Sequence, residues 1–142
     1  MNHPGVDELA SVPLFEGLSS DELAALASHF EVEDYELGHS PAKVGDHGYV
    51  FFVVSAGSAR VELDGHVMEQ LGPGSIFGEM AFFAPNSRRS ATVVVETPLR
   101  VLSLFGTDFR TMQLQYPVVA QRLEAIYKDR LARDQSLTGE QS

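Results

Sequence analysis

The sequence predicts an α+β fold, in which an antiparallel β-roll of the jelly-roll kind is flanked by N-terminal and C-terminal helices. Apolar residues recur at helical spacing near both ends of the chain. Between them, from about residue 31 to residue 105, short segments rich in Val, Phe and Tyr alternate with Gly, Pro and Asp, as strands alternate with turns. The 142 residues, 44% hydrophobic and 21% charged, suit one globular domain with its own core.

The N-terminal helix is predicted from a capping pattern. Ser19 is a suitable N-cap, and Asp21 and Glu22 follow it in the first turn, where negative charge is favourable. The apolar residues on either side of this start are Leu14, Phe15, Leu18, Leu23, Leu26 and Phe30.

The central part of the chain contains five segments with the composition of strands. They are Tyr49–Ser55, Ser58–Leu63, His66–Leu71, Ala91–Glu96 and Leu99–Phe105. Asp64-Gly65 separates two of them and is typical of a two-residue hairpin turn. Strands this short and this closely spaced favour antiparallel pairing.

The C-terminal part is predicted to contain two helices, at Thr107–Gln115 and from Pro117 to about Arg133. The apolar stripe of the second helix consists of Val118, Val119, Leu123, Ile126, Tyr127 and Leu131. Residues 134–142 show no periodicity and are predicted to form a flexible tail. We therefore expect a single domain over residues 1–133.

Composition excludes several classes of protein. Without cysteine the chain has no disulfides and no thiolate zinc site. Ten basic against twenty acidic residues give a net charge of −10, which argues against nucleic acid or an anionic membrane as a partner. No apolar run reaches the ~18 residues of a membrane span. The N-terminus lacks the basic and apolar regions of a signal peptide, so we expect a cytoplasmic protein.

Residues 77–95, FGEMAFFAPNSRRSATVVV, combine features that suit a small phosphate ligand. Arg89 offers a planar fork for bidentate contact with a phosphate, and Glu79 is an acceptor suited to a ribose hydroxyl. Four small residues allow the backbone to approach a ligand closely: Gly78, Ala81, Ser90 and Ala91. The neighbouring Arg88 is an alternative phosphate partner, although the spacing to Ser-Ala-Thr favours Arg89.

Residues 77–92 resemble the phosphate-binding cassette of the cyclic nucleotide-binding domain family, and the likeness extends over roughly Leu14 to Leu131. It includes LFEGLSSDEL at 14–23, Gly38, VGD at 44–46, FFVVSAGSARV at 51–61 and LGPGSIFGE at 71–79. The chain departs from the family at His39 and Pro41, outside the cassette. The resemblance implies that Glu79 binds the ribose 2′-hydroxyl, Arg89 pairs with the cyclic phosphate, and backbone N–H groups complete the anion site. The cyclic nucleotide-binding residues implied are Gly78, Glu79, Met80, Ala81, Arg89, Ser90, Ala91 and Thr92.

The resemblance implies a regulatory module, not an enzyme, that binds 3′,5′-cAMP and responds by moving its C-terminal helix. That helix is expected to fold over the base, with Tyr127 as the candidate cap and Leu123 and Ile126 as alternatives. Family members tuned to cGMP often have Thr after the cassette Arg, whereas this chain has Ser90, so we expect a modest preference for cAMP over cGMP.

A cupin-like jelly-roll protein that binds a metal or a sugar is the alternative of a different class. Such a metal site needs His-x-His with a following Glu and a later His. The five histidines include no His-x-His pair, and His47 and His66 adjoin glycines in predicted turns. We therefore predict no metal, no cofactor and no catalytic residue.

The length of the chain bears on what such a module controls. Only about nine residues follow the last predicted helix, too few for the winged helix-turn-helix of related transcription factors. We expect the module to act on a protein partner or on an effector domain absent from this chain.

Overall fold

The computed structural model describes residues 3–40, 50–78 and 92–139. The helices are α1 (Val6–Ala10), the 3₁₀ helix η1 (Pro13–Phe15), α2 (Ser20–Ala27), α4 (Gly106–Gln115) and α5 (Pro117–Gly139). The strands are β1 (Glu31–Tyr35), β2 (Val50–Ala56), β3 (Ala59–Leu63), β4 (His66–Leu71), β5 (Ile76–Phe77), β6 (Thr92–Val95) and β7 (Leu99–Phe105). The predicted order of helices, β-roll and helices is confirmed.

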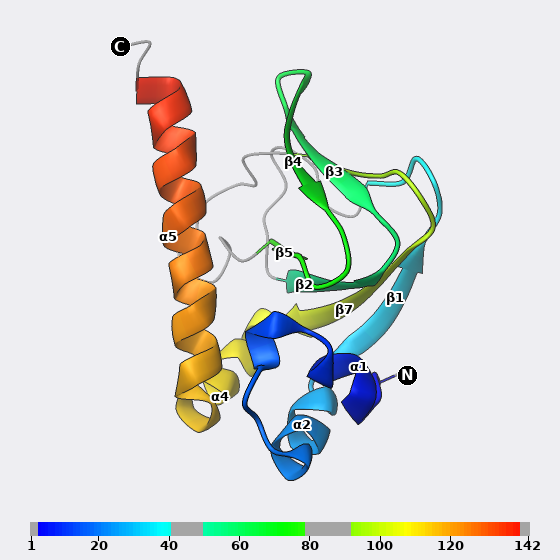
Figure 1. The fold of residues 1–142 in the computed structure, drawn as a ribbon, viewed down its shortest axis with the longest axis vertical. Coiled ribbons are helices and arrows are strands. Elements are labelled where there is room, and N and C mark those ends of the chain that lie inside the picture. The colour runs from blue at the N-terminus through cyan, green and yellow to red at the C-terminus, as the bar shows by residue number, and fades with distance from the viewer. Residues whose placement is uncertain (1–2, 41–49, 79–91, 140–142) are drawn as a thin grey trace.

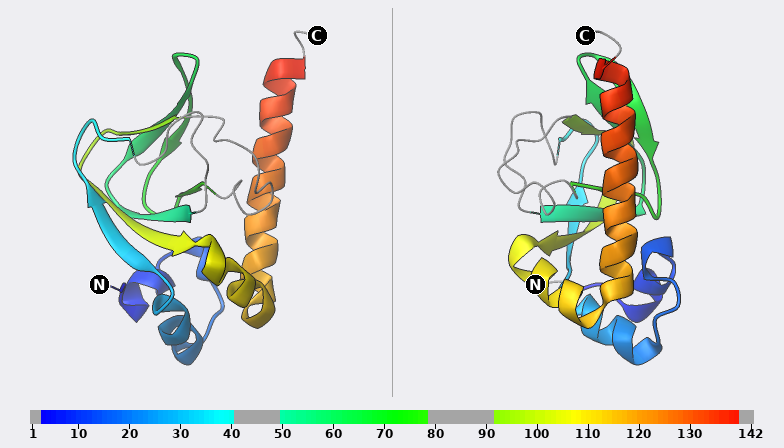
Figure 2. Two further views of the ribbon diagram at one scale, coloured as in Figure 1. Left: turned by 180° about the vertical axis from the view of Figure 1, so that it is seen from behind. Right: turned by 90° about the vertical axis from the view of Figure 1, so that its left-hand side faces the viewer.

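The strands form two antiparallel sheets. The first has the order β1-β7-β2-β5 and the second the order β4-β3-β6. Figure 1 shows α1, α2 and α4 gathered at one end of the roll, while α5 runs upright along its side, and the two views of Figure 2 agree. The predicted antiparallel roll is therefore the observed fold.

Strand β2 explains how the sequence divides its apolar residues between two cores. Successive side chains of a strand point to opposite faces, and here both faces are covered. Phe51 and Val53 enter a helix-side core between the first sheet and the helices, whereas Phe52 and Val54 enter a roll core between the two sheets. A strand buried on both faces reads as an uninterrupted apolar run, which is why VFFVV shows no alternation.

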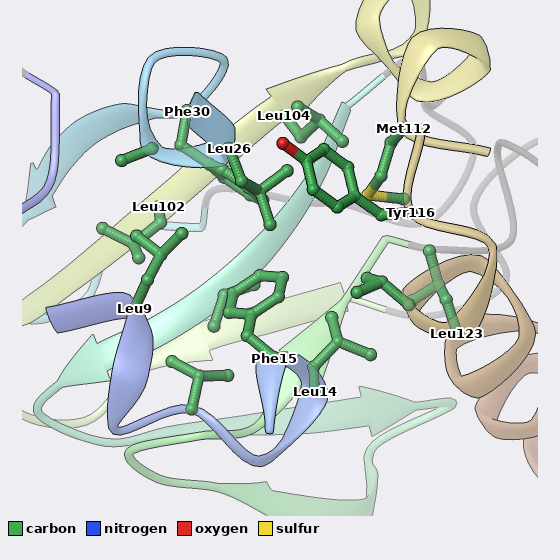
Figure 3. Packing of buried hydrophobic residues seen from close by; sticks show 14 of the residues in the cluster. Leu9, Leu14, Phe15, Leu26, Phe30, Leu102, Leu104, Met112, Tyr116 and Leu123 are labelled. Atoms are coloured by element: carbon green, nitrogen blue, oxygen red, sulfur yellow. The ribbon is translucent and has the colours of Figure 1, made fainter. Parts of the chain in front are cut away.

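The helix-side core joins the N-terminal helices to α4 and α5 (Figure 3). Phe15 and Phe51 both pack against Phe30, with ring centroids 5.6 and 6.0 Å from its own, in edge-to-face geometry. Val119 and Leu123 of α5 are completely buried in the same core. The first two turns of α5 are therefore part of the domain core.

Two local predictions are confirmed in detail. The Ser19 hydroxyl accepts a hydrogen bond from the Glu22 backbone N–H, and the Glu22 carboxylate accepts one from the Ser19 N–H, so that α2 begins with a capping box. Asp64 and Gly65 have φ of +53° and +80° and connect β3 to β4. Two successive positive φ values are those of the two-residue hairpin turn that Asp-Gly predicts.

Three features differ from the prediction. β1 and the two-residue β5 did not stand out as strands, because each is recognisable only through its partners β7 and β2. α5 continues past Arg133 to Gly139, so residues 134–139 are helical and not a loose tail; this segment contains no proline to end the helix. Val118 was predicted in the apolar stripe of this helix but is 44% exposed, because neighbouring Val119 faces the core.

Candidate functional site

The predicted anion-binding segment begins in one sheet and ends in the other. β5 ends at Phe77, and Gly78 follows with a φ of +83°, a conformation that favours glycine. Thr92 begins β6, within the predicted strand segment Ala91–Glu96, and lies opposite Glu62 of β3. The segment therefore connects the first sheet to the second.

Gly78 and Thr92 are the two predicted binding residues within the described part of the chain. The other six lie outside it: Glu79, Met80, Ala81, Arg89, Ser90 and Ala91. Their roles, and the choice between Arg88 and Arg89, stay predictions.

The roll core is apolar along β2, β5, β6 and β7, and Phe52 stacks on Phe77 with ring centroids 4.7 Å apart. A polar group adjoins it at β1. Glu33 Oε2 accepts hydrogen bonds from the fully buried Ser103 hydroxyl at 2.8 Å and from the Tyr35 hydroxyl at 3.0 Å. Burial, together with the bond to Glu33, raises the pKa of Tyr35 to about 12.

Tyr35 is the titratable hydroxyl of this polar group. A Tyr35 hydroxyl with a pKa near 12 stays protonated at neutral pH, so it acts as a hydrogen-bond donor and not as a general base. Glu33, Tyr35 and Ser103 were not among the predicted site residues. The spacing of Glu31, Glu33 and Tyr35, with one residue between each, could have indicated the β1 part of this group. It places these three side chains on one face of the strand.

A cavity of about 400 Å³ lies between α5 and the connection from β4 to β5. That volume is in the range of small-molecule sites. Its lining residues are Glu69, Gly74, Ser75, Ile76, Ile126, Asp129 and Arg130. At its edge the Arg130 Nη2 donates to Glu69 Oε2 at 3.0 Å, linking α5 to β4. The cavity thus has apolar surface from two isoleucines and charged groups of both signs.

The three predicted lid residues occupy different environments. Leu123 is completely buried in the helix-side core. Ile126 packs against that core and lines the cavity, whereas Tyr127 is half-buried. Ile126 is therefore the one of the three that the described structure places at a cavity.

The histidines of the described residues do not belong to a metal-binding cluster. His29 Nδ1 lies 3.3 Å from Asp108 Oδ1, and His3 Nδ1 lies 2.7 Å from the Phe30 carbonyl oxygen. Across residues 3–40, 50–78 and 92–139, no three His, Cys, Asp or Glu side chains cluster as metal ligands would. The described part of the chain therefore gives the cupin alternative no candidate centre.

Residues 32–116 match the family model of the cyclic nucleotide-binding domain. The chain belongs to the cyclic nucleotide-binding domain family. The predicted membership of this family is confirmed, and with it the β-roll fold.

The curated relatives that this chain resembles include two regulatory proteins. It is 33% identical over 124 residues to the cyclic AMP receptor protein of Thermus thermophilus, covering 84% of this chain and 57% of the relative. It is 38% identical over 114 residues to a cAMP-dependent protein kinase regulatory subunit of Eremothecium gossypii, covering 80% and 24%. The chain thus spans about half of one curated relative and a quarter of the other.

A solved structure has a similar fold. The structure described as Sp-2Cl-cAMPS bound to PKAR CBD2 superposes with a TM-score of 0.76 and 25% identity, covering 89% of this chain and 86% of that one. No helix in the described ranges of this cyclic nucleotide-binding domain is long and apolar enough to cross a membrane.

Proposed function

We propose that this domain binds 3′,5′-cAMP through the cassette at residues 78–92 and reports occupancy by a shift of α5. The observation that carries the proposal is the cassette motif, with its Gly-Glu pair and its Arg followed by Ser-Ala-Thr, in a chain that belongs to this family. Binding and not catalysis is the proposed activity. A protein partner, or an effector domain outside this chain, receives the signal.

In this proposal Arg89 neutralises the cyclic phosphate and Glu79 accepts the ribose 2′-hydroxyl. The described ends of the segment support it, because Gly78 adopts the positive φ that lets the chain turn out of β5, and Thr92 anchors β6. Local cations matter in a chain of net charge −10, since the overall field repels an anionic ligand.

The proposed signal depends on α5 having a fixed and a responsive part. Val119 and Leu123 hold its beginning in the helix-side core, while Ile126 lies at the cavity and Tyr127 is half-buried. A ligand under the second part would make contacts that differ between two positions of the helix. Differential contacts of that kind are what allow a ligand to shift an equilibrium.

Isothermal titration calorimetry tests the binding assignment. Arg89→Ala is expected to weaken cAMP binding by about 30-fold to several thousand-fold, the range for removing one partner of a buried charge-assisted contact. Arg88→Ala is the matched control and should bind like the unmodified protein. Equal cAMP affinity of Arg89→Ala and the unmodified protein would contradict the assignment.

Competition with cGMP tests the base preference. One hydrogen bond is worth only about 0.5–1.5 kcal/mol net, so with Ser90 at this position the affinity for cAMP is expected to exceed that for cGMP by a small factor. A tenfold advantage for cGMP would overturn the cAMP assignment. Thermal unfolding with cAMP and with EDTA separates the nucleotide from the metal alternative, since a native-state ligand raises the melting temperature and a chelator lowers that of a metalloprotein.

A further inference from the structure

Helix α5 is attached to the domain in two different ways along its length. At its beginning, Val119 and Leu123 are completely buried. Arg122 adds polar attachment, since its Nη1 donates to the carbonyl oxygens of Leu14 at 3.1 Å and Glu16 at 2.7 Å. These contacts tie the beginning of α5 to η1.

Further along, α5 reaches the roll through a charged contact. Arg130 Nη2 lies 3.0 Å from Glu69 Oε2, and the two side chains are only 15% and 27% exposed. Glu69 lies opposite Val61 of β3, and Val61 packs against the roll core. Residues directly opposite on paired strands share a face, so Glu69 lies on the face of the second sheet that is turned toward the roll core.

The same ion pair bounds the cavity between α5 and the roll. Glu69 lines it from β4 and Arg130 lines it from α5, and the two side chains meet there. Ile126 lies one helical turn before Arg130 and also lines the cavity. The ion pair therefore links two of the elements that line the cavity, β4 and α5.

We propose that the Glu69–Arg130 ion pair is a clasp that holds the outer part of α5, from Ile126 onward, against the second sheet beside the cavity. Both residues act as positioning residues. The clasp extends the proposed function, because it would govern how firmly α5 covers a bound nucleotide, and it operates in the ligand-free protein as well.

A second ion pair on the same helix gives an internal comparison. Lys128 Nζ lies 3.9 Å from Glu124 Oε1, and these side chains are 69% and 49% exposed. Exposed pairs one turn apart on a helix contribute little, whereas a shorter contact between half-buried groups is screened less by water and salt. The Glu124–Lys128 pair also lies within one helix and cannot fix that helix to the roll.

Spin labels measure the clasp directly without a nucleotide. The chain has no cysteine, so His66→Cys on β4 and Ala132→Cys on α5, both exposed sites, provide a unique labelled pair. Glu69→Gln and Arg130→Gln are each expected to broaden the distance distribution toward longer distances, and to raise hydrogen exchange over residues 126–132 about fivefold. Lys128→Gln should change neither measurement.

A charge swap separates the clasp from a general loss of structure. Glu69→Arg combined with Arg130→Glu is expected to return both measurements toward those of the unmodified protein. Single variants with the spin-label distances and hydrogen exchange of the unmodified protein would overturn the clasp. A charge-swapped variant with an unchanged melting temperature but with the longer distances of the single variants would also overturn it.

The rate of cAMP release tests whether the clasp helps to retain a bound nucleotide. In Glu69→Gln, cAMP is expected to dissociate about fivefold faster than from the unmodified protein, because a loosened α5 covers it less. An unchanged dissociation rate would overturn the role of the clasp in retention. Absence of cAMP binding by the unmodified protein would instead contradict the proposed function, and the spin-label distances would still decide whether the clasp exists.

Discussion

The Glu8 carboxylate accepts two hydrogen bonds from the Arg100 guanidinium, from Nε at 2.7 Å and from Nη2 at 3.0 Å. The Ser55 hydroxyl donates to the same carboxylate. Ser55 lies where β2 bulges, between the residues paired with Val101 and Arg100 of β7. Three segments far apart in the sequence, α1, β2 and β7, are thus joined at one carboxylate.

Glu8→Gln is expected to lower the free energy of unfolding by about 1 kcal/mol at pH 7, because the bidentate charged contact is lost at a partly exposed site. Chemical denaturation measures this change. Glu36→Gln, at an exposed position just after β1, is the control and should stay within about 0.5 kcal/mol of the unmodified protein.

The same contact makes a prediction about pH. The hydrogen bond from Arg100 lowers the pKa of Glu8 below its ordinary value of 4.5. A carboxylate with a lowered pKa in the folded state stabilises the protein above its unfolded pKa, and that stabilisation disappears as the pH falls through the folded pKa. The stability difference between the unmodified protein and Glu8→Gln should therefore shrink below about pH 4.5. A difference that grows on acidification would contradict the assignment.

Gly57→Ala is expected to destabilise the fold by more than about 2 kcal/mol. Gly57 has a φ of +87°, and a Cβ there would lie 2.1 Å from the Pro98 carbonyl oxygen, which belongs to the backbone. The turn from β2 to β3 and the turn before β7 approach too closely for any side chain.

Gly65→Ala is the matched control for Gly57→Ala in denaturant unfolding. Gly65 has a similar φ of +80°, but a Cβ there would meet nothing within 4 Å. Gly65→Ala should therefore lower the free energy of unfolding only by the backbone strain, about 1–2 kcal/mol. Equal losses from the two variants would show that the close approach to Pro98 contributes nothing.

Arg122→Ala is expected to loosen the beginning of α5 and to reduce stability by about 1–3 kcal/mol, because two backbone carbonyls of the η1 region lose a charged donor. Hydrogen exchange over residues 117–123 should rise with it. Arg110→Ala, on an exposed position of α4, should leave this exchange unchanged; a rise of the same size in both variants would refute a specific role for Arg122.

Adding cAMP is expected to increase hydrogen-exchange protection both at 78–92 and at 117–131, since the ligand would contact the cassette and the helix together. Tyr127→Ala should weaken binding if its ring stacks on the purine, an interaction worth about 1–3 kcal/mol per base. Lys128→Ala, on the neighbouring exposed position, is the control. If added cAMP protected only the cassette from hydrogen exchange and Tyr127→Ala bound cAMP normally, α5 would pack in the core without contacting the ligand.

Much of the roll was predictable because its signals are local. The capping box of Ser19 and Glu22 acts over three residues, and Asp64-Gly65 sets the β3–β4 hairpin through its own φ values. The cassette motif likewise lies in one short stretch, which is why the family could be inferred before the fold was known.

The sequence by itself determined where helices and most strands form, and it predicts which short segment binds an anion. Tertiary structure decided which side chains meet: Glu8 with Arg100, Glu33 with Ser103, and Glu69 with Arg130. These partners are 92, 70 and 61 residues apart, and neither partner's local sequence specifies the other. Such contacts exist only after the sheets pair and α5 packs, because folding alone brings polar groups that are distant in sequence within hydrogen-bond distance.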